Sequence, residues 1–304
     1  MPAAYAPPPS SSRRRCGSIP VVTTPADADK TAIKSSRRSV TATLIAVTHT
    51  VATHERITPL LSEPRIIAGP AGDKRFKMET KDTTLEFRVL TEDHRDATMI
   101  VISRAFCTLP LSVALPGKRG VTDNILALDL QMDHCVSLGL SMIAIDKSKN
   151  RIAGGCLLRD HKWRPQCREY IDQWVQNRQR PTAALTNAVL HADNLASKTF
   201  PLLDDCREGE IVDLWCIGVH PDYRGRKIAS SLFSRAIPVA TSAGYRYAVV
   251  ECINAHTSRI AEKLGFTLIV RYDAKSEFRW DGELVFSKVE PPHGFIDIWI
   301  LELR

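Results

Sequence analysis

Residues 210–230 limit what this chain can fold into more than any other segment. Residues 210–219 are apolar apart from Glu210 and Asp213, which is typical of a buried strand. The strand runs into His220-Pro221, and a helix is then entered through residues 224–229, which read Arg-Gly-Arg-Lys-Ile-Ala. Unpaired backbone N–H groups and the positive end of the helix dipole make such a helix start a natural cradle for phosphate. The segment has neither the Walker nor the Rossmann glycine spacing.

Strands and helices alternate on both sides of this segment. Leu85–Leu90 alternates apolar and polar side chains as a half-buried strand does, and Thr91 is placed to cap a helix that reaches Phe106. Apolar periodicity predicts further elements: helices over 121–136, 167–179, 182–198, 226–243 and 258–264, and strands over 140–145, 151–158, 210–219, 245–253 and parts of 265–303. Pro238 is expected to kink or shorten its helix, and Gly244 to end it. This order predicts a single α/β or α+β domain.

Composition separates the first 81 residues from the rest. The 304 residues are 44% hydrophobic and 25% charged, as in ordinary globular proteins, and no apolar run approaches the ~18 residues of a membrane span. Residues 1–81 hold 13 Lys/Arg and 6 Asp/Glu, whereas residues 82–304 hold 28 of each. The net charge of +7 therefore belongs to the Ser/Pro/Arg-rich N-terminal segment, which has too few apolar residues to build a core. We predict a disordered basic tail over 1–81 and a neutral domain over 82–304.

The tail permits more than one interpretation. Plain disorder, or an inaccurate gene start, is one. An Arg/Ser-rich and acid-poor start is also typical of an organellar transit peptide, although Pro7-Pro8-Pro9 argues against an amphipathic helix at the very beginning. The basic charge of the tail would suit a weak tether to nucleic acid or chromatin. The neutral domain has no excess of positive charge for such a role. We expect a cytoplasmic monomer without membrane contact.

The eight cysteines contain no CxxC pair and no zinc-finger spacing with histidine. Several lie inside apolar runs, such as Cys216 in Leu-Trp-Cys-Ile. We interpret them as buried free thiols of a reducing compartment. Since no other constellation of metal ligands is present in the sequence, we expect no metal.

Two motifs resemble those of the Gcn5-related N-acetyltransferases (GNAT). Residues 224–229 resemble motif A, (Q/R)-x-x-G-x-(G/A): Arg224 matches its first position and Ala229 its last, whereas Lys227 stands where a glycine is usual. Residues 249–254, which end in Asn254, and residues 261–266 resemble motif B. Ala261 stands where many members have a tyrosine that serves as general acid. Both motifs have the order and spacing of the family, and the resemblance covers the chain from residue 85 onward.

The resemblance implies a fold, a co-substrate and a binding site. The fold is a mixed, mostly antiparallel central sheet, flanked by helices and splayed at the acetyl-CoA site. Acetyl would pass directly from acetyl-CoA to an amine, with the pantetheine between residues 215–219 and 250–254 and one backbone N–H near residues 216–217 facing the thioester oxygen. The cofactor-binding residues that the resemblance implies are Ile217, Gly218, Val219, Arg224, Gly225, Arg226, Lys227, Ile228, Ala229 and Asn254.

A narrower resemblance is to the arylalkylamine and dopamine N-acetyltransferases of the invertebrate type. These enzymes carry Glu-Asp after the first strand and Glu-Pro-Leu after the first helix. This chain has Glu92-Asp93 and then Leu109-Pro110-Leu111, so that Leu109 replaces the acid of the second motif. A histidine ahead of the last strand, His293, is also similar.

Three residues are candidates for the chemistry. The resemblance implies Glu92 as the general base that deprotonates the amine; the alternative is a solvated acid in a first helical turn. Asp213 is the second choice, because an acid in an apolar strand is costly without a purpose, and a structural hydrogen bond or an exposed position is its alternative. Ser258 could relay a proton to the departing thiolate or, as the alternative, cap the 258–264 helix. Strand alternation would place Asp213, Trp215 and Ile217 on one face, opposite Leu214 and Cys216.

Other residues have simpler interpretations. His220 is expected to be a structural turn residue, and Cys252 a core residue rather than a nucleophile, since it has no histidine paired with it in the sequence. Trp163, Trp174 and Trp215 could line a pocket for an aromatic amine, although aromatic side chains are more often plain core.

The predicted function is acetyl-CoA-dependent N-acetylation of a small, arylalkyl-type amine. Long inserts over 108–136 and 160–208 favour a closed acceptor pocket. A protein or peptide N-acetyltransferase with an open groove stays open as an alternative within enzymes. From another class, a catalytically silent acetyl-CoA-binding sensor is compatible with Ala261 and Lys227.

Overall fold

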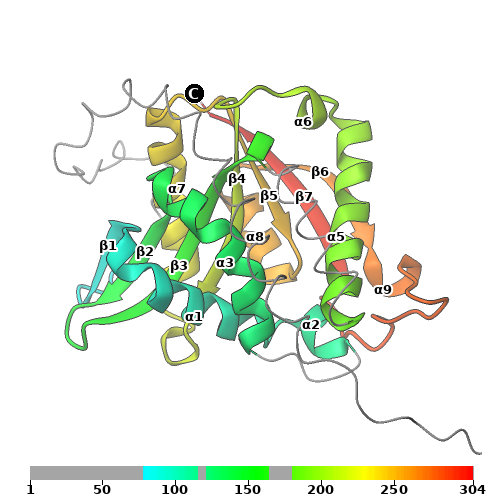
Figure 1. Ribbon diagram of the computed structural model, residues 1–304, viewed down its shortest axis with the longest axis horizontal. Coiled ribbons are helices and arrows are strands. Elements are labelled where there is room, and N and C mark those ends of the chain that lie inside the picture. The colour runs from blue at the N-terminus through cyan, green and yellow to red at the C-terminus, as the bar shows by residue number, and fades with distance from the viewer. Residues whose placement is uncertain (1–77, 116–120, 164–179, 304) are drawn as a thin grey trace, which may run out of the picture. The chain divides into compact units, whose positions relative to one another are not determined.

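The computed structural model describes residues 78–115, 121–163 and 180–303, and a seven-stranded sheet forms its centre (Figure 1). The strand order is β1-β2-β3-β4-β5-β7-β6. The strands are β1 (Leu85–Val89), β2 (Met142–Asp146), β3 (Arg151–Asp160), β4 (Ile211–Val219), β5 (Tyr247–Cys252), β6 (Thr267–Asp273) and β7 (Phe295–Glu302). Every neighbouring pair is antiparallel except β4 and β5, which are parallel. This is the mixed, mostly antiparallel sheet of the GNAT fold, as predicted.

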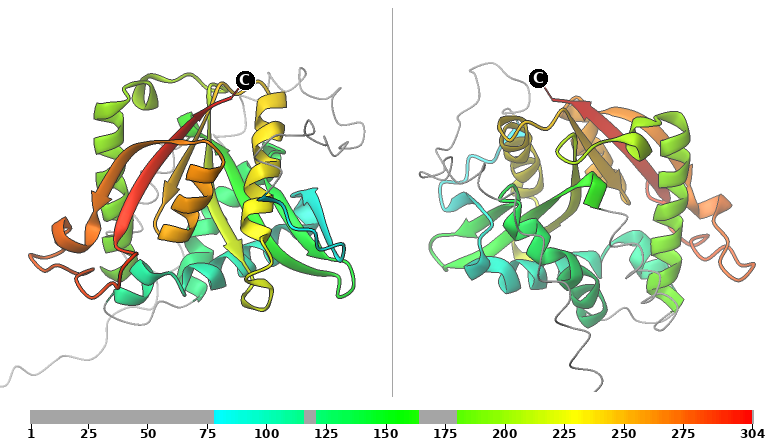
Figure 2. Two further views of the ribbon diagram at one scale, coloured as in Figure 1. Left: turned by 180° about the vertical axis from the view of Figure 1, so that it is seen from behind. Right: turned by 45° about the horizontal axis from the view of Figure 1, so that its top comes forward.

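Helices cover both faces of the sheet. In Figure 1, α1 (Arg95–Phe106), α3 (Val121–Ser137) and α5 (Arg180–Thr199) lie on the near face. The view from behind in Figure 2 shows α7 (Ile228–Ser242) and α8 (Ala255–Lys263) on the opposite face. The short helices are η4 (Glu92–His94), α2 (Pro110–Ala114), η5 (His161–Trp163), α6 (Leu202–Asp205), η6 (Pro221–Tyr223) and α9 (Ala274–Glu277).

The alternation of strand side chains separates the core into layers on the two faces. On β2, Met142 and Ala144 pack into the cluster that contains the apolar side of α7, whereas Ile143 and Ile145 pack with α1 and α3. A third cluster joins α5 to the β5-β7-β6 part of the sheet. The sheet is therefore buried on both sides, which fixes the direction of each strand side chain.

Two glycines seat α1 directly on the sheet. Gly155 on β3 pairs with Gly218 on β4. A Cβ at Gly218 would lie 2.7 Å from the Cα of Ile102, and one at Gly155 would lie 2.7 Å from a methyl carbon of Thr98. Only residues without a side chain allow the helix axis to come this close. The approach fixes the C-terminal end of α1 beside the end of β4.

The boundaries agree with the predicted elements except at three helices. Thr91 does not cap the first of them: its side chain makes no capping hydrogen bond, and the turn η4 separates it from α1, which begins at Arg95. The helix predicted over 258–264 begins earlier, at Ala255, because the side chain of Asn254 caps it by accepting from the backbone N–H groups of His256 and Thr257. Ser258 therefore is not its cap, which corrects that alternative. Pro238 does not shorten α7, which continues to Ser242 before Gly244 adopts a φ of 91°. The predicted helix over 167–179, Trp174 and two of the cysteines, Cys16 and Cys167, lie outside the described residues.

The first described residues lie along α7, although the prediction assigned most of them to the tail. The Ser230 hydroxyl donates to the carbonyl of Met78, and the Thr80 N–H donates to the hydroxyl of Ser231. Glu79 forms an ion pair with Arg235 at 2.6 Å. Among the helices whose residues the structure describes, none has the length and hydropathy needed to cross a bilayer.

Candidate active site

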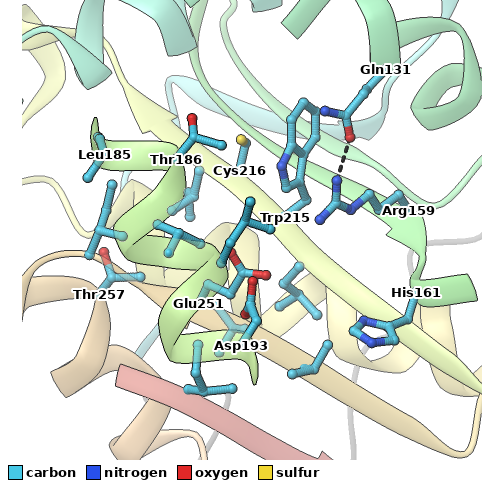
Figure 3. A pocket seen from close by; sticks show the side chains of 18 of the residues that line it. Gln131, Arg159, His161, Leu185, Thr186, Asp193, Trp215, Cys216, Glu251 and Thr257 are labelled. Carbon is cyan, nitrogen blue, oxygen red and sulfur yellow. Dashed lines mark hydrogen bonds between the residues drawn. The ribbon is translucent and has the colours of Figure 1, made fainter. Parts of the chain in front are cut away.

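β4 and β5 separate shortly after they begin to pair. They are joined through only three residue pairs, of which the last is Asp213 with Val249. Beyond this point the strands diverge, and a cavity of about 310 Å³ lies at the split. Leu214–Ile217 line it from β4, and Val249, Val250 and Glu251 line it from β5 (Figure 3). This splay is the feature that the predicted fold places at its acetyl-CoA site.

A β-bulge at Trp215 changes the predicted alternation of β4. The register with β3 runs from Leu158 opposite Leu214 to Leu157 opposite Cys216, so that Trp215 is the extra residue. Cys216 therefore packs in the same cluster as Trp215, whereas Ile217 packs against the cluster on the other face. The prediction placed these last two residues the other way round, because a strict alternation cannot anticipate an extra residue.

Helices from the two long inserts line the cavity from the near face. From α3, Leu128 and Gln131 line it; from α5, Thr186 and Val189 are among the lining residues. The end of α1 contributes Phe106. The described parts of α3 and α5 thus wall one side of the cavity, and a closed acceptor pocket stays a prediction.

A loop with free N–H groups follows β4. Gly225 and Lys227 both have left-handed backbones, with φ of 77° and 61°, and α7 begins directly after them. Within the described chain, no backbone acceptor receives the N–H groups of residues 228–230, which open the helix. Arg224 donates to the hydroxyl of Thr108 at 2.6 Å, which ties the loop to the end of α1. The left-handed conformation explains why a glycine is usual at the position of Lys227, and the lysine keeps this conformation at some cost.

The motif A cations differ in their surroundings. Arg224 and Lys227 are exposed, whereas Arg226 is half-buried and forms an ion pair with Asp82. The guanidinium of Arg226 also lies over the ring of Tyr223, 5.0 Å from its centroid. Arg226 is therefore held against the segment before β1, which leaves Arg224 and Lys227 as the exposed positive charges of this loop.

Asp213 lies beneath the cavity in a buried ion pair. Its Oδ2 accepts from Nε and Nη2 of Arg159 at 2.8 and 2.6 Å. The side chains expose 0% and 4% of their surfaces, and Arg159 also donates to Gln131 at 2.5 Å. Arg159 lines the cavity and stacks on Trp215, whereas Asp213 is not among the lining residues (Figure 3). The structure thus gives Asp213 the structural role that the sequence left as its alternative.

Glu92 and Ser258 lie outside the cavity. Glu92 opens η4 after β1, at the far edge of the sheet, and its side chain is 74% exposed, 3.9 Å from Arg95. Ser258 is buried, and its hydroxyl donates to Asp297 on β7 at 2.5 Å. Neither residue is among those that line the cavity. The structure does not bring the three predicted catalytic residues together, because the first strand and the split are separated by β2 and β3.

Two carboxylates that the sequence analysis did not select lie in the cavity. Glu251 is on β5, two residues beyond the last pair with β4, and Asp193 is on α5. Figure 3 shows their side chains turned toward each other across the cavity. Glu251 is an acid within the apolar run of β5, which is the same signal that drew attention to Asp213. Asp193 carried no such signal, since acids are common on half-buried helices.

The remaining candidates have structural contacts. The Nδ1 atom of His220 accepts from the Asp222 N–H, as expected of a turn residue. Trp163 stacks on His134 with ring centroids 4.3 Å apart and does not line the cavity. Burial raises the pKa of the thiols of Cys252 and Cys216, so both are neutral thiols of the core or the cavity wall. In the described part of the chain, no group of three or more His, Cys, Asp or Glu side chains could hold a metal ion.

Comparisons with known proteins agree with this fold. Residues 139–266, which include both motifs, match the model of the acetyltransferase (GNAT) family. A search of curated protein sequences finds no match to the chain. Among solved structures, arylalkylamine N-acetyltransferase 2 from Aedes aegypti is 18% identical with a TM-score of 0.57, and the match covers 73% of this chain and 100% of that one.

Two further structures are similar to the same extent. The polyamine N-acetyltransferase of Drosophila melanogaster is 16% identical with a TM-score of 0.57, over 72% of this chain and 100% of that one. An arylalkylamine N-acetyltransferase-like protein 5b from a mosquito is 15% identical with a TM-score of 0.59, over the same shares. At identities this low, the structural similarity shows a shared fold and nothing more. The match of residues 139–266 to the GNAT family model agrees with the splayed sheet, which has the GNAT fold.

Proposed function

We propose that this chain is an acetyl-CoA-dependent N-acetyltransferase that transfers acetyl directly to a small amine. The observation that carries the proposal is the split between β4 and β5, with a cavity at the split and a loop of free N–H groups at the end of β4. A thioester donor needs an extended slot, a phosphate site at one end and a dry acceptor cavity at the other. These three features follow one another along residues 213–230.

The donor would lie along the free edge of β4. Main-chain groups of Ile217 and Val219 are suited to pair with the pantetheine, with Gly218 between them allowing the close approach of α1. The N–H groups of residues 225–229 would hold the pyrophosphate, helped by the charges of Arg224 and Lys227. An N–H near the bulge would stabilise the oxyanion that forms on the acetyl oxygen.

The acceptor would occupy the cavity between β5 and the helices α3 and α5. Its walls are mixed: Phe106, Leu128 and Val189 are apolar, whereas Asp193 and Glu251 are acidic. Such a cavity suits an amine that carries an apolar or aromatic group, since the ammonium would face the acids and the rest of the molecule the apolar walls. This supports a small amine, of arylalkyl type or a polyamine, over a lysine within a folded protein.

Thiol release from acetyl-CoA by the full chain, with a panel of amines, tests the proposal. The panel holds tryptamine, dopamine, putrescine, amino acids and a lysine peptide. We expect turnover with at least one small amine and none with the peptide. Turnover with the peptide alone would favour a peptide acetyltransferase, and binding of acetyl-CoA without any turnover would favour a sensor. Absence of acetyl-CoA binding by calorimetry would refute the proposal.

A further inference from the structure

The ionisable groups of the cavity fall into two sets. Apart from the thiol of Cys216, the charged and titratable side chains that line it are Arg159, His161, Lys162, Asp193, Asp204 and Glu251. Only Asp193 and Glu251 lie at the split itself, from the two walls that face each other (Figure 3). A group that takes a proton from the amine must lie at the split, where the thioester would be.

Arg159, Lys162 and Asp204 each form a hydrogen bond with another part of the chain. Arg159 is held by Asp213 and Gln131. Asp204 is exposed and accepts from Ser197 at 2.8 Å, and Lys162 donates to the carbonyl of Asp204 at 3.3 Å. These residues therefore belong to the floor and the rim of the cavity.

His161 is at the wrong end of the strands for this task. It follows Asp160, which pairs with Val212, and β4 is still joined to β5 at that level. The split begins only after Asp213, so His161 lies toward the closed end. Glu251 lies beyond the last pair on β5, across the split from the bulge at Trp215.

The strand alternation directs Glu251 to the acceptor side. Val249 packs in the cluster of α5, and Val250 packs in the cluster of α7 on the opposite face. Glu251 therefore shares the face of Val249, where α5 carries Asp193 and lines the cavity. The position where related enzymes carry an acid in the Glu-Pro-Leu motif is Leu109 here, which also lines the cavity and offers no base.

We propose that Glu251 is the general base of the transfer and that Asp193 is its positioning partner, which holds the ammonium between the two carboxylates. This inference rests on the proposed function. The ammonium gives one proton to Glu251, and the nitrogen lone pair then forms the N–C bond to the acetyl carbon while the C=O electrons move to oxygen. The C–S bond breaks as the carbonyl re-forms, and the second proton that leaves nitrogen balances the one that the thiolate gains.

Two facing carboxylates suit both stages of this reaction. One can accept the proton, whereas the other stays ionised and stabilises the positive charge that develops on nitrogen when the N–C bond forms. Two like charges that face each other in a cavity also repel, and an arriving cation relieves this repulsion. The acceptor is thereby expected to bind as its ammonium form.

The test compares two amines of almost the same shape with the full chain. 2-Phenylethylamine arrives as an ammonium, whereas its β,β-difluoro analogue is largely unprotonated at neutral pH. We expect Glu251→Gln to lower kcat/KM for the ordinary amine by about 100-fold or more, the range of general base catalysis. The loss for the difluoro analogue should be at least tenfold smaller. Asp193→Asn should act mainly by raising KM for the ordinary amine.

Matched variants separate a base from a structural residue. Glu92→Gln removes the acid that the resemblance favours as the base, which does not line the cavity, and this variant should keep kcat/KM within about threefold of the wild type. Calorimetric binding of acetyl-CoA should be unchanged in Glu251→Gln. Equal losses for the two amines, or full activity of Glu251→Gln, would overturn the inference and leave the proposed function standing. A wild-type chain that acetylates neither amine nor any member of the earlier panel would overturn both.

Discussion

The buried guanidinium of Arg159 forms an ion pair with Asp213 at the floor of the cavity. The variant Asp213→Asn therefore tests how much this ion pair contributes to the stability of the fold. The two side chains expose 4% and 0% of their surfaces and are joined by hydrogen bonds of 2.8 and 2.6 Å. Removing one partner of a buried ion pair costs about 3–5 kcal/mol, because the other charge stays buried without compensation. Asparagine keeps an oxygen that can accept one of the bonds, so we expect the lower end, about 3 kcal/mol.

Urea denaturation of the full chain, followed by circular dichroism, measures this loss. An unchanged slope with a lower midpoint would show that stability, and not the compactness of the unfolded chain, has changed. For a domain of this size the loss corresponds to a melting temperature lower by about 6–12 °C. The control is Arg159→Met combined with Asp213→Asn, which removes the buried charge together with its partner and should recover at least half of the loss.

A loss below about 1 kcal/mol in Asp213→Asn would refute this reasoning. It would mean that the guanidinium finds another anion, and the carboxylates that line the cavity are Asp193, Asp204 and Glu251. In that case the variant should retain stability but lose activity, since Arg159 would then compete with the amine.

Further predictions follow from single contacts. Gly218→Ala should destabilise the fold by about 1–3 kcal/mol in thermal unfolding, because its Cβ would lie 2.7 Å from the Cα of Ile102. Asn254→Ala should cost about 1 kcal/mol by removing the cap of α8, whereas Ser258→Ala, which is not a cap, should lower stability only through its lost bond to a carboxylate. Burial lowers the pKa of His134, so the folded state disfavours its protonation; urea midpoints should fall as the pH drops below about 6.5, and less so in His134→Phe.

The sequence predicts the order of the elements well because each is stabilised by its own local pattern. The apolar stretch of β4, the alternation of β1 and the glycines that end α7 and α8 are visible without knowledge of the fold. The bulge at Trp215 is not, because an extra residue in a strand is stabilised by the neighbouring strand and by the helix above it. The early start of α8 was missed since Asn254 was assigned to the cofactor rather than to the cap.

The candidate site was predicted only in part, for the same reason. The β4 edge and the loop over residues 224–229 are contiguous in sequence, and the resemblance to motif A predicts their place at the split. The acceptor side combines β5 with α3 and α5, which are far apart along the chain, so no local pattern joins Glu251 to Asp193. The resemblance implied Glu92 as the base, yet the distance of Glu92 from the split depends on strand order, which the local pattern does not determine.

The short pairing of β4 and β5 also determines where the sheet should open locally. The sheet consists of two antiparallel parts, β1–β4 and β5-β7-β6, that share a ladder of three residue pairs. Backbone amides along the diverging edges lack a strand partner there, so their hydrogens should exchange with deuterium far faster than those of β2 and β3. An extended ligand seated in the split would restore the missing ladder. Occupancy would then join the two parts into one continuous sheet, and the slowing of exchange across it would report that the slot is filled, whether or not an acceptor is bound.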